Sequence, residues 1–297
     1  MQHIYIILLS LFISGCVTTN VVVTPKSEYP TAKKQPISKL KNIDLSTSAF
    51  IKVDPNFDPL AEPACFKEAV DFWELVYTSP GSDTIVYDTR NHIIHEINED
   101  TPWRNRKAVA FNLIREVKSR VTNDLDIKAQ IGARRTFEHG LDNAHKYVPY
   151  IQKRLREEGM PVDLALIPLV ESSFNLKARS KVGALGAWQI MPRTLKLYAK
   201  GNKTKLYDIK FATEVAIKIL KDNYNELGSW PLAINAYHSG QGRLMKAKRE
   251  LNTTDICTVV KNFDGKGYKS ASRQYYAQFL AARRLYAKYN ILLVSNK

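Results

Sequence analysis

The sequence contains few of the patterns that mark metal or cofactor enzymes. It has no HExxH string, and no cluster of cysteines and histidines accompanies His92 and His95. We therefore interpret these two histidines as solvated or hydrogen-bonded side chains and not as metal ligands. A glycine-rich phosphate loop and a nucleophile elbow are also missing. The sequence thus predicts neither a metal nor any other cofactor.

Strand patterns are scarce as well. The best strand signal, at residues 84–87, is short, whereas apolar residues recur at helical spacing from about residue 65 onward. This periodicity predicts a mostly α protein with a helical N-terminal region at 65–145, a second helical domain at 146–290 and a tail at 291–297. The two helical parts together suffice for a sizeable core, and we expect them to pack as one body. Residues 16–64, rich in Pro, Ser, Thr and Lys, are interpreted as an extended tether.

The N-terminus has the features of an export signal. Residues 4–12 form an apolar run that is too short to span a bilayer and is followed by Ile13-Ser14-Gly15-Cys16. That string resembles a bacterial lipobox, which makes residues 1–15 a predicted lipoprotein signal peptide and Cys16 the predicted lipidation site on the membrane. Because the residues before the run include no Lys or Arg, a plain secretory signal is the alternative. Val17 is not an inner-membrane retention residue, which favours the outer membrane, facing the periplasm.

Only three cysteines are present. If Cys16 carries a lipid, Cys65 and Cys257 remain, and an exported protein meets an oxidising compartment where they can pair. Free cysteine is also a common small core residue, and the sequence slightly favours that reading.

The formal net charge of +15 indicates an acidic partner, with twelve Lys and Arg against three Asp and Glu in residues 241–297. Export makes nucleic acid an unsuitable partner, which leaves anionic cell-wall polymers and lipid headgroups. A solvated basic face that keeps the protein soluble is the alternative.

Glu171 is the strongest candidate for a catalytic residue. It follows the apolar run at residues 164–170, where loss of water should raise the pKa of a carboxyl group and suit it to donate a proton. The alternative is a glutamate that ends a buried helix with its carboxylate in water.

Two segments after Glu171 have the composition of a sugar-binding cleft. Small residues surround a turn at 180–187, so that a ligand can approach the backbone, and Ser180, Gln189 and Met191 offer polar and apolar contacts there. Some forty residues later, Tyr237 lies in a segment from which its hydroxyl can reach back to Glu171. We predict that these four residues bind the substrate.

The order of these pieces resembles the soluble-lytic-transglycosylase family. The similarity comprises the ESSF string at 171–174, ARS at 178–180, GALGAWQIMP at 183–192 and AYHSG at 236–240, and extends over about residues 145–285. The resemblance implies a lysozyme-like α-helical domain that cleaves the β-1,4 bond between N-acetylmuramic acid and N-acetylglucosamine in peptidoglycan glycan strands. In this family one glutamate acts first as acid and then as base, and the muramoyl C6 hydroxyl closes a 1,6-anhydro ring without water. Glu171 matches that glutamate.

The chain departs from the family pattern at His238, where an asparagine is common. Protonation of this histidine would make activity pH-sensitive. Ala271 replaces a frequent glutamate, which leaves the roles of Tyr275 and Tyr276 open. Two other functions remain compatible with the sequence: a muramidase that uses water, and a peptidoglycan-binding scaffold without catalytic activity.

Overall fold

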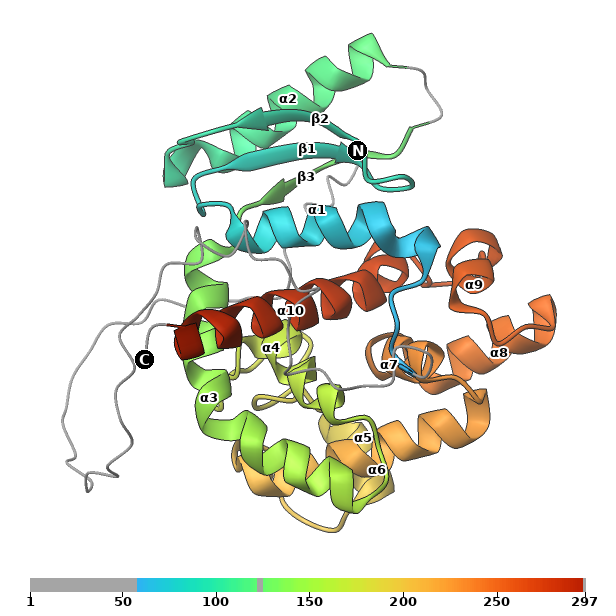
Figure 1. Cartoon of the computed structure of the whole chain (residues 1–297). Coiled ribbons are helices and arrows are strands. Elements are labelled where there is room, and N and C mark those ends of the chain that lie inside the picture. The colour runs from blue at the N-terminus through green and yellow to red at the C-terminus, as the bar shows by residue number, and fades with distance from the viewer. Residues whose placement is uncertain (1–57, 122–124, 296–297) are drawn as a thin grey trace.

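The computed structural model describes residues 58–121 and 125–295, and helices predominate among them, as the sequence predicted (Figure 1). The predicted signal peptide, Cys16 and most of the predicted tether lie outside the described residues. Within the described part of the chain, no helix combines the length and the apolar character that a membrane crossing requires.

The N-terminal region contains a small sheet that the sequence did not predict in full. Its elements are η2 (Ala64–Phe66), α1 (Lys67–Thr78), β1 (Thr84–Asp88), β2 (Ile94–Asn98), η3 (Trp103–Asn105), α2 (Arg106–Arg120) and β3 (Ile127–Ile131). The three strands form an antiparallel sheet in the order β2-β1-β3. Only β1, which is fully buried, was predicted; β2 has no buried residue, and its sequence carries no clear alternation.

Helices cover both faces of this sheet (Figure 1). On one face α2 packs through Leu113 and Val117 against Val86 of β1. On the other face lies α1, where the ring of Phe72 stacks on Tyr87 at a centroid distance of 4.0 Å. The sheet is therefore a layer between α2 and the rest of the molecule.

The remaining chain is helical. It comprises α3 (Arg134–Glu157), η4 (Val162–Leu166), α4 (Ile167–Ser172), α5 (Pro192–Tyr198), η5 (Lys203–Tyr207), α6 (Ile209–Leu227), α7 (Trp230–Ser239), α8 (Gln241–Leu251), α9 (Ile256–Asn262) and α10 (Ser270–Ser295). The 24-residue helix α3 crosses the predicted boundary between residues 145 and 146 without a break, so the two regions share a helix there. Most of their buried apolar residues form one continuous core, and a smaller separate cluster lies between the sheet and α2.

Local sequence explains where α6 begins and ends. The Asp208 carboxylate accepts hydrogen bonds from the backbone N–H groups of Lys210 and Phe211, which caps the first turn. The last turn stops at Gly228, whose φ of 71° is the left-handed conformation that glycine adopts without strain.

The long helix α10 lies between α1 and α4 and connects the two regions (Figure 1). Arg283 pairs with Asp163 at 2.6 Å and with Asp58 at 2.7 Å, while Arg284 pairs with carboxylates of Glu62, Asp71 and Glu74. Residues 58–64, which the sequence assigned to the tether, therefore lie against α10. Leu60, 1 % exposed, is part of the core.

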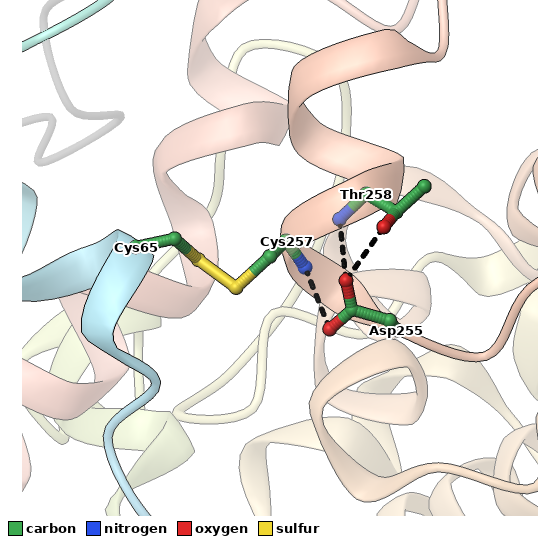
Figure 2. Close-up of a disulfide and its surroundings, with 4 residues drawn as sticks. All are labelled: Cys65, Asp255, Cys257 and Thr258. Carbon is green, nitrogen blue, oxygen red and sulfur yellow. Dashed lines mark hydrogen bonds between the residues drawn. A yellow bond between two sulfur atoms is a disulfide. The ribbon is translucent and has the colours of Figure 1, made fainter.

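A disulfide between Cys65 and Cys257 joins η2, just before α1, to α9, across 192 residues of sequence (Figure 2). The interpretation of two free cysteines, which the sequence slightly favoured, is thus wrong. Beside the bridge, Asp255 caps α9 by accepting hydrogen bonds from the backbone N–H groups of Cys257 and Thr258, at 3.3 and 2.8 Å (Figure 2).

Loss of this disulfide should destabilise the protein. A crosslink that closes so long a loop restricts the unfolded chain strongly, and we expect Cys257→Ser to lower the free energy of unfolding by about 2–5 kcal/mol. Chemical denaturation of the purified variant measures this difference. Cys65→Ser and the double variant should lose the same amount, because all three lack the same bond. Equal stability of the wild-type protein with and without reductant would contradict the prediction.

Candidate active site

Glu171 lies in the last turn of the short helix α4, whose other residues are almost all buried. Pro168 in the first turn fixes a helical φ at the start, and the helix ends at Ser173 with a left-handed φ of 52°. The apolar run before Glu171 is thus the inner wall of the core, as its composition suggested. Glu171 itself is half-buried, so its carboxyl group lies at the edge of the core.

Burial raises the pKa of Glu171 to about 7, because the charged form loses its water. One contact opposes this effect: the Tyr275 hydroxyl donates a hydrogen bond of 2.6 Å to Oε1, which favours the carboxylate and lowers the pKa. Burial has the larger influence. At neutral pH the group is therefore divided between its protonated and ionised forms, as an acid that later acts as a base requires.

Three tyrosines from separate parts of the chain, two of them buried and Tyr237 half-buried, surround this carboxyl group. They are Tyr77 of α1, Tyr237 of α7 and Tyr275 of α10, and burial together with the charge of Glu171 raises the pKa of each hydroxyl. All three are therefore hydrogen-bond donors at neutral pH. The Tyr77 hydroxyl has no hydrogen-bond partner among the described residues.

The structure corrects the sequence interpretation of Tyr237. Its hydroxyl donates to the backbone carbonyl of Trp188 at 2.8 Å, and the residue that contacts the acid is Tyr275. Sequence reasoning left the role of Tyr275 open because Ala271 departs from the family pattern. Tyr275 lies 104 residues from Glu171, and the packing of α10 on α4 brings the two together. The run of aromatic residues at 275–276 was the one available signal.

Ser180 and Gln189 stabilise the turn between them. The Ser180 Oγ accepts a hydrogen bond from the Ala184 N–H at 2.9 Å, and the Gln189 Nε2 donates to the Gly186 carbonyl at 2.7 Å. Gln189 itself has a left-handed φ of 48°. Both polar groups therefore hold the backbone of the turn in this structure.

A glycine is required at the tip of this turn. Gly186 has a φ of 73°, and a Cβ atom there would lie 2.0 Å from the Leu206 carbonyl oxygen. The turn is fastened to the core on the other side by Trp188, whose indole N–H donates to the Thr213 hydroxyl at 3.0 Å. Ser172, next to Glu171, donates to the Ala187 carbonyl at 2.8 Å. These contacts fix the turn relative to the acid.

Met191 lies apart from the acid's hydrogen-bonded partners. It lines a small pocket of about 340 Å³ together with Gly183, Pro192 and Tyr207. Arg179, Arg193 and Lys203 also line this pocket, so it offers both polar and apolar contacts to a sugar ring.

His238 contacts Tyr275, the residue that donates a hydrogen bond to Glu171. Its ring stacks on Tyr275 with centroids 4.4 Å apart and planes 15° apart. Desolvation by the surrounding protein atoms and the charge of Arg243 lower the pKa of His238 to about 4, although the residue keeps a solvent-exposed edge. Its change of charge thus lies below neutral pH.

Comparisons with known proteins identify the segment that holds Glu171. A family model described as "Transglycosylase SLT domain" matches residues 149–259. The chain is 37% identical over 109 residues to "Membrane-bound lytic murein transglycosylase D" of Escherichia coli (strain K12), an alignment that covers 35% of this chain and 24% of the relative.

Two further relatives extend this similarity. Over 212 residues the chain is 26% identical to "Membrane-bound lytic murein transglycosylase C" of Yersinia pestis (strain Pestoides F), covering 63% of this chain and 59% of the relative. It is 34% identical over 109 residues to "Putative tributyltin chloride resistance protein" of Alteromonas sp. (strain M-1), covering 35% of this chain and 52% of the relative. The chain thus spans about a quarter of the first relative's length and less than two thirds of the others.

The raised pKa of Glu171 predicts a pH-dependent stability difference between the wild-type protein and Glu171→Gln. In the folded protein the pKa is about 7, and the ordinary value is 4.5. The unfolded chain therefore ionises more readily, and the folded wild-type protein loses stability as the pH rises from 4.5 to about 7. Glutamine does not ionise. Relative to wild type, the variant should therefore gain up to about 3 kcal/mol between about pH 4 and pH 8, which denaturation curves at both pH values measure.

Tyr275→Phe tests whether the Tyr275 hydroxyl lowers the pKa of Glu171. The hydroxyl group favours the carboxylate, so its removal should raise the pKa of Glu171 further, as infrared titration of the carboxyl band detects. A Glu171→Gln variant whose stability follows wild type at every pH would show that the carboxyl group is not desolvated.

Proposed function

We propose that this chain is a peptidoglycan lytic transglycosylase, on the basis of the match of residues 149–259 to the transglycosylase SLT domain. The observation that carries the proposal is Glu171, a carboxyl group with a pKa near 7 that receives a hydrogen bond from Tyr275. The substrate is a glycan strand of alternating N-acetylmuramic acid and N-acetylglucosamine, and the bond cleaved is the β-1,4 bond from the muramic acid.

In the first step protonated Glu171 donates its proton to the glycosidic oxygen, and the bond from C1 to that oxygen breaks. Positive charge develops at C1, and the leaving N-acetylglucosamine keeps the proton. Glu171 is now a carboxylate. The hydrogen bond from Tyr275 stabilises this charged form, which burial alone would oppose.

In the second step the carboxylate of Glu171 removes the proton of the muramoyl C6 hydroxyl as its oxygen forms a bond to C1. This closes the 1,6-anhydro ring and returns Glu171 to its protonated state, so no water is consumed. The pKa near 7 supports both roles, since proton transfer in either direction is then close to balanced at neutral pH.

The four predicted substrate-binding residues have separate parts in this proposal. Ser180 and Gln189 shape the turn that borders the sugar site, through the backbone contacts described above. Met191 offers an apolar surface to a sugar ring. Tyr237 holds the Trp188 carbonyl and so fixes the other end of the turn.

A hydrolytic muramidase is the second candidate, because the same acid can protonate the same oxygen. A muramidase would use water in the second step and leave a reducing muramic acid end. The mass of the product separates the two reactions, since the anhydro product is lighter by one water.

Glu171→Gln should reduce turnover on purified peptidoglycan by roughly 10²–10⁴-fold, the contribution of positioned acid–base catalysis. The substitution preserves the size of the side chain and removes the exchangeable proton. Mass spectrometry of the digest measures both the rate and the product, and wild type should give anhydro-muramic ends. Glu99→Gln is the matched control, since it makes the same change at an exposed glutamate outside the site. Near-normal turnover by Glu171→Gln would refute the assignment of the acid.

The location of the protein is part of the proposal. Two relatives carry the words "membrane-bound" in their names, and the lipobox-like string that ends at Cys16 supports a lipid anchor in the cell envelope. We propose the outer membrane, with the protein facing the periplasm.

Cys16→Ala should abolish labelling by a radioactive or clickable fatty acid and move the protein from the membrane fraction to the soluble fraction. One cysteine at the end of the signal supplies the acylated thiol, so no other residue replaces it. Cys257→Ser serves as the control and should keep the label. Unchanged labelling and unchanged mass of Cys16→Ala would contradict the anchor.

A further inference from the structure

A groove of about 1220 Å³ lies between the N-terminal region and the start of α10, apart from Glu171 and its hydrogen-bonded partners. We call it the interdomain groove. One wall comprises the start of α1 and the turn between β1 and β2; the other comprises α9 and the first turn of α10. It is larger than the range of about 300–1,000 Å³ that is typical of sites for small molecules. An extended ligand is thus a better match to its size.

The disulfide holds the two walls at a fixed separation. It joins Cys65 to Cys257 (Figure 2). Cys65 belongs to the first wall and Cys257 to the second, and both line the groove. Because a covalent bond and not only side-chain packing joins the walls, the groove is formed before any ligand arrives. Preformed sites bind with a smaller loss of conformational entropy.

Two exposed cations face the interdomain groove from opposite walls. Arg90 lies in the turn between β1 and β2, and Lys261 lies in α9. No ion pair or hydrogen bond involves either side chain among the described residues. They are therefore available to bind an anion between them.

The other charged groups of the groove are engaged or lie at its side. Arg273 donates hydrogen bonds to the carbonyls of Val260 and Phe263, and so adds positive charge while holding the end of α9. The carboxylate of Asp126 pairs with Lys128 at 2.9 Å. Glu68 is the remaining acid of the lining, and Lys67 beside it in sequence pairs with Asp71, so one carboxylate stands against the two cations. The unpaired charge of the groove is thus mainly positive, which suits a ligand with carboxylates.

Apolar residues complete the lining. Phe66, Ala69 and Val260 contribute to the walls, and Ile93 at the rim is 54% exposed. A ligand that matches this surface has carboxylates for the two cations and small alkyl groups for the apolar parts. A short peptide that contains alanine and acidic residues has this chemistry, and such peptides are attached to the muramic acids of peptidoglycan.

The position of the groove relative to Glu171 agrees with this ligand. The Tyr87 hydroxyl donates at 3.3 Å to Gln274, a lining residue of the groove, and the next residue, Tyr275, holds the acid. Neighbouring residues of a helix point in directions about 100° apart, so the groove and the acid lie on different faces of one turn of α10. A peptide of about five residues extends about 16 Å, and the diameter of a helix is about 10 Å. A peptide attached to a sugar beside Glu171 is therefore long enough to pass around α10 to the groove.

We propose that the interdomain groove binds the carboxylate-bearing peptide of a glycan strand whose sugars lie beside Glu171. The inference rests on the proposed function for its substrate, but binding of the peptide does not require turnover. Arg90 and Lys261 are the residues that recognise the carboxylates.

The first test measures binding of a synthetic stem tetrapeptide to the full chain with its disulfide intact. Calorimetry compares wild type, Arg90→Glu/Lys261→Glu and the control Lys107→Glu/Arg249→Glu, which makes the same change of charge at two exposed positions outside the groove. We expect wild type and control to bind alike, and the groove variant to bind roughly tenfold more weakly, the effect of losing two partly exposed ion pairs. Equal binding by all three proteins, or no binding to any, overturns the proposal.

The second test measures kinetics on peptidoglycan and on the same glycan strands after an amidase has removed the peptides. The groove variant should show a raised KM on intact peptidoglycan only, with an unchanged kcat on stripped strands. An equal change on both substrates overturns the proposal, because the cations then act on the polymer as a whole. Peptide binding without any glycan cleavage would refute the proposed function and leave the groove assignment standing.

The third test uses vesicles that contain phosphatidylglycerol, because a lipid headgroup is also anionic. We expect wild type and the groove variant to bind these vesicles equally. Vesicle binding that depends on Arg90 and Lys261, together with no peptide binding, would overturn the proposal in favour of a membrane surface.

Discussion

The hydrogen bond from Tyr275 to Glu171 is the contact on which the architecture of the site depends. Glu171 ends a buried apolar helix, so its charged form is costly, and this single contact of 2.6 Å offsets part of that cost. The bond requires α10 to lie against α4. The placement of α10 is set in turn by Arg283 and Arg284, which pair with acids of residues 58–74 and with Asp163. Contacts of the N-terminal region thus determine the geometry of a carboxyl group far away in the sequence.

The opposite side of the site is rigid for different reasons. Its turn uses left-handed backbone at Gly186 and Gln189, and a side chain at Gly186 would collide with the Leu206 carbonyl. Trp188 is fully buried and hydrogen-bonded to Thr213, which fastens the turn to α6. A rigid turn facing a fixed acid gives a site whose shape exists before a ligand binds. Such preorganisation is the usual source of electrostatic stabilisation in catalysis.

Local patterns in the sequence were sufficient for part of this picture. The apolar run before Glu171 predicted its desolvation, and helical periodicity predicted the fold class. Contacts between distant segments were beyond local patterns: Tyr275 lies 104 residues from Glu171, and the disulfide joins cysteines 192 residues apart. The residues of β1 are all buried, whereas β2, which was missed, has no buried residue, and β3, also missed, has a polar residue at every second position. Leu60 was assigned to the tether because prolines surround it, although tertiary packing buries it.

The segment that matches the family model does not contain the whole site. It covers residues 149–259 and so includes Glu171, the turn and Tyr237, but it ends before Tyr275 and begins after Tyr77. Both of these tyrosines are buried near the acid. Tyr77 comes from α1, and its ring stacks on Phe137 with centroids 4.4 Å apart. A fragment cut at the limits of the matched segment would expose Glu171 to water and remove its hydrogen-bond donor. The pKa of the acid is therefore a property of the N-terminal region and α10 packed together on the matched domain.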